Sequence, residues 1–154
     1  MGNLRLTSSA FTDGAEIPRK FGYKNGNVSP PLTIRGYSHE LKSLALIMDD
    51  PDAMGAVGKV WVHWVVWNIP PSLEIAESTK NMPDTWGIEG MTDFGEVGYG
   101  GPAPPDKRHT YVFKLYALDT KLDLPDKSTK ADVEKAMEGH ILEEATLKGT
   151  YAPD

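Results

Sequence analysis

Two aspartates follow an apolar segment of the chain at a spacing that could serve one site. Asp50 and Asp52 come directly after the apolar run 43–48 and its neighbour Asp49. Side chains two residues apart on an extended backbone point to the same face, with Cα atoms roughly 7 Å apart. Two carboxylates can therefore face one ligand. The same aspartates around Pro51 are also typical of a polar turn that closes a strand, and the spacing leaves both interpretations open.

A histidine lies inside segment 60–69, which is β-branched and aromatic almost throughout. In a regular strand His63 shares a face with Trp61, Val65 and Trp67. A buried imidazole needs a hydrogen-bond partner or water. This pattern fits a structural histidine, and it also fits a ring on the floor of a pocket with Trp61 as a wall.

The connection between the aspartates and this segment is short, because only residues 53–59 separate the two. If these residues form a hairpin loop, Asp50 lies opposite Val62, since the register of a hairpin follows from its loop. That register would bring the carboxylates close to His63.

A glycine- and proline-rich loop precedes a second histidine. Residues 98–105 read Gly-Tyr-Gly-Gly-Pro-Ala-Pro-Pro. Glycines let a ligand approach backbone N–H groups, which can form an anion-binding nest, although the lysine of a phosphate loop is absent and such a segment is often only a loop. His109 and Tyr111 follow, and they share a face if their segment is extended.

Three chemistries fit these aspartates, histidines and tyrosine. A zinc or iron site lacks any H-x-H or H-E-x-x-H spacing. Acid–base catalysis by a histidine–aspartate pair is a second interpretation, although no G-x-S-x-G nucleophile motif is present. A small-anion pocket is the third. Because carboxylates repel phosphate, it requires protonated His63 and His109, or a proton kept by a carboxyl or by the ligand. It predicts tighter anion binding as pH falls towards about 6.5.

Strands and one helix must position these groups. Apolar and β-branched runs predict strands at 4–7, 43–48, 60–69, 111–118 and 146–151. One helix is expected after the N-cap candidates Ser128 and Thr129. Its apolar stripe recurs every four residues as far as the stop signal Lys148-Gly149, and consists of Val133, Met137, Ile141 and Ala145.

Composition limits the class of protein. A chain of 154 residues predicts a single domain over residues 1–154, and its 15 glycines and 12 prolines favour a mainly β fold. A net charge of −6 argues against a nucleic-acid partner. No segment has the apolar length of a signal or a membrane span, so we expect a cytoplasmic protein without stable membrane insertion. The absence of cysteine excludes a disulfide scaffold and a thiolate nucleophile.

The ordered motifs of the chain resemble the phosphatidylethanolamine-binding protein family, in its short bacterial and archaeal, Raf kinase inhibitor-like branch. The resemblance is collinear over almost the whole sequence. It includes the N-terminal Asn-Val-Ser-Pro-Pro segment at 27–31, Asp-Pro-Asp-Ala at 50–53, the histidine-bearing strand around His63, the glycine-rich loop at 98–102, a departed form of the H-R-Y signature at 109–111, and Gly-Thr-Tyr at 149–151.

This resemblance implies an antiparallel β-sandwich with one or two peripheral α-helices. It also implies a pocket for a small anion: phosphate, a phosphoethanolamine-like head group or an acetate-sized ligand. By motif position the implied pocket residues are Asp50, Asp52, Trp61, His63, Gly101, Pro102, His109 and Tyr111.

The resemblance further implies a binder that modulates a kinase, a serine protease or a signalling complex, commonly as a homodimer. It implies no enzymatic activity, and the sequence gives no reason to expect a cofactor or a metal ion. Two alternatives stay open. One is a protease or kinase inhibitor that acts through the loop 100–105, and the other is a hydrolase that depends on a metal or on a His/Asp pair.

Three positions depart from the family pattern. Met54 replaces a proline after Asp-x-Asp-Ala, and Ala103 stands where this branch often has cysteine. Thr110 replaces the arginine of H-R-Y, which removes a cation next to the histidine. Lys107 and Arg108 precede that histidine and are candidates to replace the lost charge.

Overall fold

Strands make up most of the regular secondary structure. The computed structural model describes residues 3–77 and 87–154. In chain order its elements are β1 (Arg5–Thr7), the 3-10 helix η1 (Arg19–Phe21), β2 (Leu32–Arg35), β3 (Ser43–Asp50), α1 (Ala53–Val57), β4 (Trp61–Ile69), β5 (Glu74–Ile75), β6 (Ile88–Glu89), β7 (His109–Leu118), α2 (Lys130–Met137) and β8 (Ile141–Tyr151).

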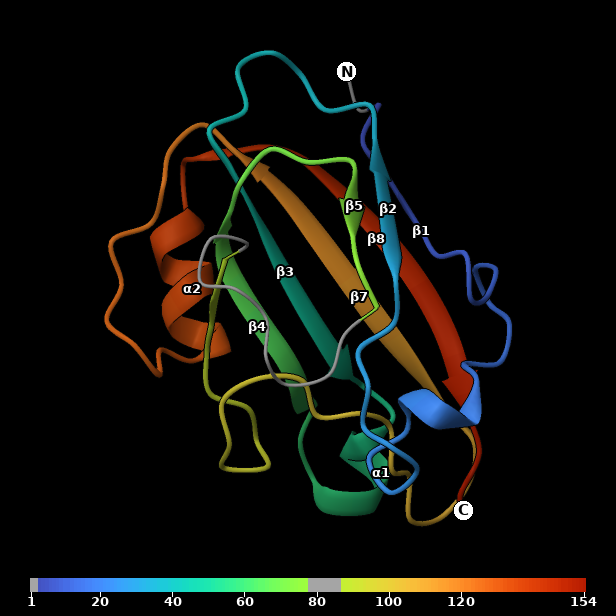
Figure 1. Ribbon diagram of the computed structural model, residues 1–154. Coiled ribbons are helices and arrows are strands. Elements are labelled where there is room, and N and C mark those ends of the chain that lie inside the picture. The colour runs from blue at the N-terminus through green and yellow to red at the C-terminus, as the bar shows by residue number, and fades with distance from the viewer. Residues whose placement is uncertain (1–2, 78–86) are drawn as a thin grey trace.

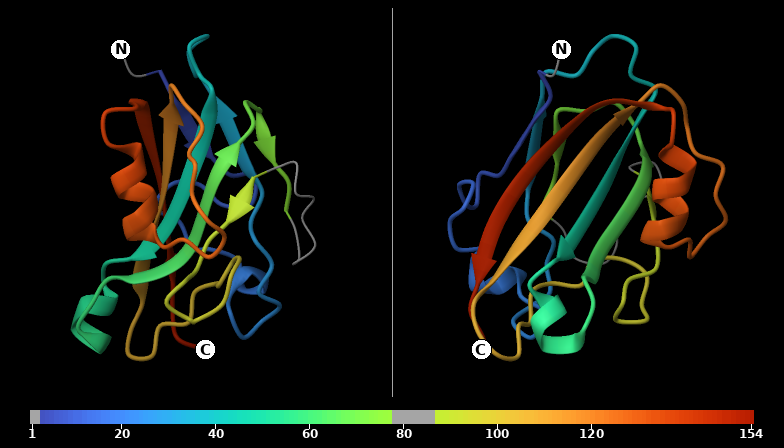
Figure 2. Two further views of the ribbon diagram at one scale, coloured as in Figure 1. Left: turned by 90° about the vertical axis from the view of Figure 1, so that its left-hand side faces the viewer. Right: turned by 180° about the vertical axis from the view of Figure 1, so that it is seen from behind.

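These strands form two antiparallel sheets that pack face to face (Figure 1). The larger sheet has the order β6-β4-β3-β7-β8, and the smaller sheet has the order β1-β2-β5. Figure 2 shows the larger sheet between the smaller sheet on one side and α2 on the other. The predicted β-sandwich with peripheral helices is therefore confirmed.

The central strand β3 has an unbroken apolar sequence because both of its faces are covered. Leu44, Leu46 and Met48 belong to the core between the two sheets, whereas Ala45 and Ile47 pack in a second core that includes α2 residues. Every residue of β3 is buried. A strand buried on both faces loses the usual alternation of apolar and polar residues, which explains the continuous run.

Consecutive aspartates at the end of β3 face opposite layers. Asp49 lies on the α2 side, where its buried carboxylate accepts hydrogen bonds from the ammonium groups of Lys114 at 3.2 Å and Lys130 at 2.8 Å. Lys130 is the first residue of α2, so this ion pair ties the helix to the sheet. Asp50 points to the other face.

The predicted helix is much shorter than its apolar stripe indicated. Thr129 caps α2 in a reciprocal capping box with Asp132, as expected, but the helix ends at Met137. Gly139 follows with φ +80°, and residues 141–151 form β8 along the edge of β7. A four-residue repeat is also a multiple of the two-residue period of a strand. The stripe beyond Met137 was therefore ambiguous, and the helical interpretation of Ile141 and Ala145 is wrong.

A β-bulge in β4 changes the face on which its side chains lie. Met48 pairs with Trp64 but Asp49 pairs with Val62, so His63 is an extra residue opposite β3. Beyond the bulge, Val65 packs on the α2 side, whereas Trp64 packs between the sheets. His63 thus shares a face with Trp61 but not with Val65 or Trp67, because the bulge breaks the alternation.

The connection between β3 and β4 also differs from the expected hairpin loop. It contains the short helix α1, which ends at Val57 and is followed by Gly58 with φ +78°. Asp50 pairs with Trp61 rather than with Val62. This shift of one residue still leaves Asp50 close to the start of β4, where His63 lies.

Candidate functional site

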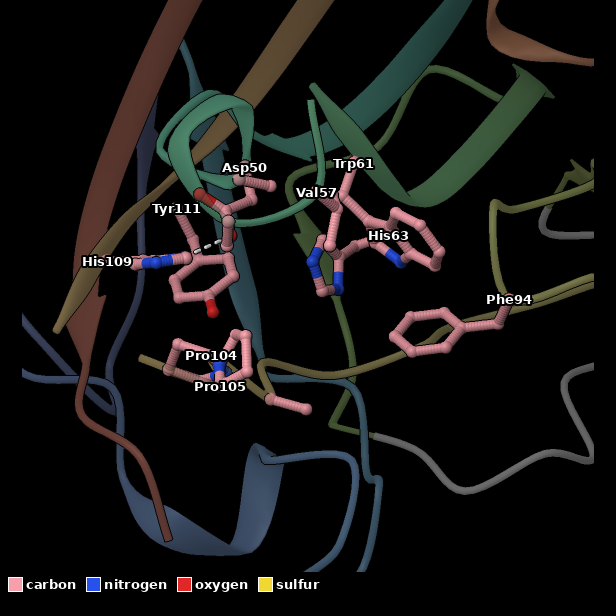
Figure 3. Close-up of a pocket in the computed structure, with 12 residues that line it drawn as sticks. Asp50, Val57, Trp61, His63, Phe94, Pro104, Pro105, His109 and Tyr111 are labelled. Atoms are coloured by element: carbon pink, nitrogen blue, oxygen red, sulfur yellow. Dashed lines mark hydrogen bonds and ion pairs between the residues drawn. The ribbon is translucent and has the colours of Figure 1, made fainter. Parts of the chain in front are cut away.

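A pocket of about 150 Å³ lies at the end of the larger sheet where β3 ends and β4 and β7 begin (Figure 3). Strand ends and two loops contribute its walls. It is lined by Asp50, Ala53, Ala56, Val57, Trp61, His63, Phe94, Ala103, Pro104, Pro105, His109 and Tyr111. Five of the eight residues implied by the resemblance therefore lie together, and three do not: Asp52, Gly101 and Pro102.

A buried histidine between two carboxylates forms one side of the site. The Nδ1 atom of His109 is 2.6 Å from Oδ2 of Asp50, and its Nε2 atom is 2.7 Å from Oδ1 of Asp106. When both carboxylates are ionised they only accept hydrogen bonds, so both ring nitrogens must donate and His109 is then an imidazolium. This cation offsets the charge of Asp50 in the pocket.

The pKa values around His109 follow from this geometry. Burial lowers the pKa of His109, but the hydrogen bonds to Asp50 and Asp106 outweigh burial and raise it above 6.5. Burial raises the pKa of Asp50, an effect that the hydrogen bond from His109 only partly offsets. Burial also tends to raise the pKa of Asp106, but the hydrogen bond from His109 lowers it overall.

His63 differs from His109 because it is a neutral ring. It is almost completely buried, and its Nδ1–H donates to the carbonyl oxygen of Gly100 at 2.7 Å. Burial lowers the pKa of His63 to about 4. With the proton on Nδ1, the Nε2 atom carries a lone pair and acts as an acceptor.

The hydroxyl of Tyr111 faces the same space. Its ring meets the His63 ring edge-on, with centroids 5.1 Å apart. The hydroxyl oxygen is buried and makes no well-formed hydrogen bond among the described residues, although the Asp50 carboxylate and the backbone of Ala103 lie near it. Burial, followed by the nearby charge of Asp50, raises the pKa of Tyr111 well above its usual value, so the hydroxyl keeps its proton. The pocket therefore presents a hydroxyl donor without a well-formed hydrogen bond beside the His63 acceptor.

Apolar side chains complete the walls. Phe94 lies edge-on to Trp61 and His63, and it stacks on Tyr23 with ring centroids 4.3 Å apart. Across the pocket, α1 contributes Val57, which is 52% exposed at the mouth. Phe94 was not among the predicted pocket residues, because it belongs to a loop without periodicity.

Asp52 does not share the pocket with Asp50. Its backbone N–H donates to Oδ1 of Asp50 at 2.9 Å, and its own Oδ2 accepts from the backbone N–H of Thr110 at 2.8 Å. The expectation that both carboxylates face one ligand failed because the chain turns after Asp50 rather than continuing as a strand. Asp52 instead joins the end of β3 to the beginning of β7.

The glycine-rich loop does not form the expected nest of free N–H groups. The N–H of Gly100 donates to the carbonyl oxygen of His63 at 2.8 Å, and the N–H of Gly101 donates to Oδ1 of Asn27 at 2.7 Å. Gly101 and Pro102 are buried and do not line the pocket. Pro102 accepts a hydrogen bond from the N–H of Tyr23 at 3.0 Å.

The two cations before His109 do not replace the arginine of the family pattern. Arg108 donates to Glu16 at 2.6 Å and to Thr150 at 3.1 Å, and neither Arg108 nor Lys107 lines the pocket. Asp106, by contrast, is the second carboxylate on His109 and was missed in the sequence. Its place three residues before His109 was the signal that could have indicated it.

The fold and the pocket define a β-sandwich with a small, mostly apolar pocket at one end of its larger sheet. A sequence model of the phosphatidylethanolamine-binding protein family matches residues 7–152. The UPF0098 protein of Methanothermobacter thermautotrophicus is 48% identical over 153 residues, which cover 96% of this chain and 98% of the relative. The UPF0098 protein of Chlamydia muridarum is 41% identical over 153 residues, which cover 98% of this chain and 100% of the relative.

Solved structures of the same family also resemble this chain. The crystal structure of CT736 from Chlamydia trachomatis, a phosphatidylethanolamine-binding protein homologue, matches all of both chains with a TM-score of 0.90 and 38% identity. The crystal structure of YbcL from E. coli, a member of the same family, matches with a TM-score of 0.89 and 30% identity. The match covers 99% of this chain and 100% of YbcL. The chain belongs to the phosphatidylethanolamine-binding protein family, in its bacterial and archaeal branch.

Two further findings concern membrane-spanning helices and metal sites. Neither α-helix in the described part of the chain has the length and apolar character needed to cross a membrane. Within residues 3–77 and 87–154, no group of three or more histidine, cysteine or acidic side chains is arranged to hold a metal ion.

Proposed function

We propose that the pocket binds a small anion that keeps one acidic proton, such as the monoanion of a phosphomonoester, and does not transform it. The observation that carries this proposal is the convergence of the Tyr111 hydroxyl donor and the His63 Nε2 acceptor in one largely apolar pocket. A protonated phosphate can accept from the former and donate to the latter. Because the imidazolium of His109 offsets Asp50, the pocket tolerates one negative charge.

The same geometry supports binding rather than catalysis. Both nitrogens of His109 are occupied by carboxylates, so this ring is a poor general base. The low pKa of His63, about 4, makes it a weak base at neutral pH. No serine, threonine or cysteine is among the described residues that line the pocket. A protein of this kind suits modulation of a partner such as a kinase or protease.

The buried state of the glycine-rich loop favours the pocket over the alternative of a protruding inhibitory loop. Gly100, Gly101, Pro102 and Pro104 are all buried. An inhibitory loop that enters another protein's cleft must instead expose its backbone and side chains. We therefore place the function at the pocket.

Replacing Tyr111 with phenylalanine tests the site directly. We expect affinity for phosphoethanolamine to fall about tenfold, because one hydrogen bond to a charged ligand is lost. The unbound variant should be more stable by about 1 kcal/mol, because a buried hydroxyl that makes no well-formed hydrogen bond is removed. Calorimetric titration and chemical denaturation measure the two effects. Tyr116→Phe, on the far face of the larger sheet, is the matched control and should leave affinity unchanged.

Unchanged affinity in Tyr111→Phe would contradict the proposed ligand position, whatever its effect on stability. Stability gained together with affinity lost is the pattern of a group kept for binding rather than for folding.

The pH dependence of binding should follow the ligand's proton. His63 stays neutral above its pKa of about 4, so at pH 6 to 8 the complex must take up the proton that a phosphomonoester loses near pH 6. Affinity for the total ligand should fall about tenfold for each pH unit above about 6. This slope is the same whether the shared proton lies on the ligand or on His63.

A phosphodiester provides the control for this titration, because it carries one negative charge and no proton that titrates between pH 6 and 8. Its binding should be weak and independent of pH over that range. Affinity for the monoester that stays constant or rises with pH would contradict proton-linked binding.

A further inference from the structure

Asn27 lies outside the pocket but contacts the loop that holds His63. It follows η1 in the N-terminal segment, and its side-chain amide makes two hydrogen bonds to the glycine-rich loop. Its Oδ1 accepts from the N–H of Gly101 at 2.7 Å, and its Nδ2 donates to the carbonyl oxygen of Tyr99 at 3.2 Å. These two groups belong to the residues on either side of Gly100.

His63 makes the complementary pair of hydrogen bonds to Gly100 itself. The N–H of Gly100 donates to the backbone carbonyl of His63 at 2.8 Å, and its carbonyl accepts from Nδ1–H of His63 at 2.7 Å. The N–H of Gly101 and the carbonyl of Gly100 are parts of one planar peptide group, as are the carbonyl of Tyr99 and the N–H of Gly100. Asn27 and His63 therefore hold the same two peptide planes from opposite ends.

This arrangement fixes more than the position of a loop. A hydrogen bond at the N–H end of a peptide group polarises its carbonyl and strengthens it as an acceptor. The carbonyl of Gly100 is the group that keeps the proton of His63 on Nδ1 and leaves Nε2 free to accept. Rotation of that peptide plane would take this acceptor away from Nδ1 and would permit the other tautomer.

The backbone of Asn27 suits this role. Its φ of +54° lies in the left-handed region, which asparagine adopts more readily than most residues. Other contacts hold the flanks of the loop independently, since the Tyr99 hydroxyl donates to the carbonyl of Phe21 at 2.9 Å and the N–H of Tyr23 donates to Pro102 at 3.0 Å. Loss of the Asn27 amide should therefore release the Gly100 peptide without releasing the whole loop.

We propose that Asn27 is a positioning residue for the ligand pocket, which sets the tautomer of His63 through the two peptide groups that flank Gly100. The part of this proposal that concerns affinity rests on the proposed function. The part that concerns the tautomer does not, because it can be measured without a ligand.

The chain offers a matched control for a variant of Asn27. Asn68 also has a left-handed backbone, with φ +55°, and its side-chain amide also makes two backbone hydrogen bonds, both to Leu122, at 2.7 and 2.8 Å. Asn27→Gly and Asn68→Gly each remove such an amide and retain a residue that tolerates positive φ. Only the first variant touches the pocket.

Nitrogen NMR of the imidazole rings at pH 7 is the decisive measurement. We expect His63 to be a single Nδ1–H tautomer in the unaltered protein and a mixture of both tautomers in Asn27→Gly. Affinity for inorganic phosphate at pH 6 should fall roughly three- to tenfold in the same variant. Asn68→Gly should lose stability to a similar extent but should retain the tautomer and the affinity.

Two additional measurements keep the test decisive if Asn27→Gly does not fold. Asn27→Asp keeps an acceptor for the N–H of Gly101, so it should keep the single tautomer. In the unaltered protein the Gly101 amide should exchange slowly with solvent. A single Nδ1–H tautomer in folded Asn27→Gly, or rapid exchange of the Gly101 amide, would overturn the proposal. A tautomer change without phosphate binding in any form would support the positioning role and overturn the proposed function.

Discussion

Replacing His109 with alanine will lower the free energy of unfolding by about 3–5 kcal/mol, the range measured when one partner of a buried ion pair is removed. Asp50 is only 3% exposed, and its Oδ2 has His109 at 2.6 Å. Without the imidazolium, this carboxylate must stay buried with an uncompensated charge or take up a proton. Denaturation in urea at pH 7 measures the loss.

A second histidine–aspartate pair provides the comparison. His140 lies 2.9 Å from Asp119 with nearly half of its side chain exposed, so His140→Ala should cost less than about 1 kcal/mol. The double variant His109→Ala/Asp50→Ala should recover part of the loss, because it removes the stranded charge as well. Equal costs for His109→Ala and His140→Ala would show that burial of the pair has no energetic consequence.

Gly101→Ala is expected to be the second severe substitution. A Cβ atom at this position would lie 2.1 Å from the carbonyl oxygen of Phe21 and 2.9 Å from the backbone of Gly22 and Tyr23. These are backbone atoms that cannot rotate away, so residues 21–23 and the glycine-rich loop must move apart. We expect a loss of about 3 kcal/mol, at the upper end for overpacking, together with weaker phosphate binding as Gly100 moves away from His63.

Gly55→Ala is the matched control for this substitution. Gly55 lies in α1 and is exposed, and a Cβ there meets no atom within 4 Å. Alanine also favours a helix over glycine, so the variant should be unchanged or more stable by about 0.5 kcal/mol. If Gly101→Ala were as stable as Gly55→Ala in thermal unfolding, the close approach of the two segments would not be a constraint.

The sequence was sufficient for the parts of the site that depend on strand periodicity. Asp50, His63, His109 and Tyr111 lie where apolar runs begin or end, and an antiparallel sheet brings such ends together. Strand β8 was harder to predict, because a spacing of four residues fits a helix and a strand equally until Gly139 decides between them.

The rest of the site depends on contacts that no local pattern encodes. The bulge at His63 changes a face without changing the composition of the strand. The direction of Asp52 depends on the N–H of Thr110, 58 residues away. The ionisation of His63 and His109 depends on burial and on the carboxylates of Asp50 and Asp106, so identical side chains acquire different charge states.

The bulge in β4 also limits how this pocket could be transferred to another scaffold. A regular strand can present Trp61 and His63 to one side, but it would then send Trp64 to the far side and empty a position between the sheets. Any designed copy needs the additional residue as well as the ligand-facing side chains. Deleting one residue at the bulge would restore a regular strand. The side chains on one side of the deletion would then move to the opposite face of β4.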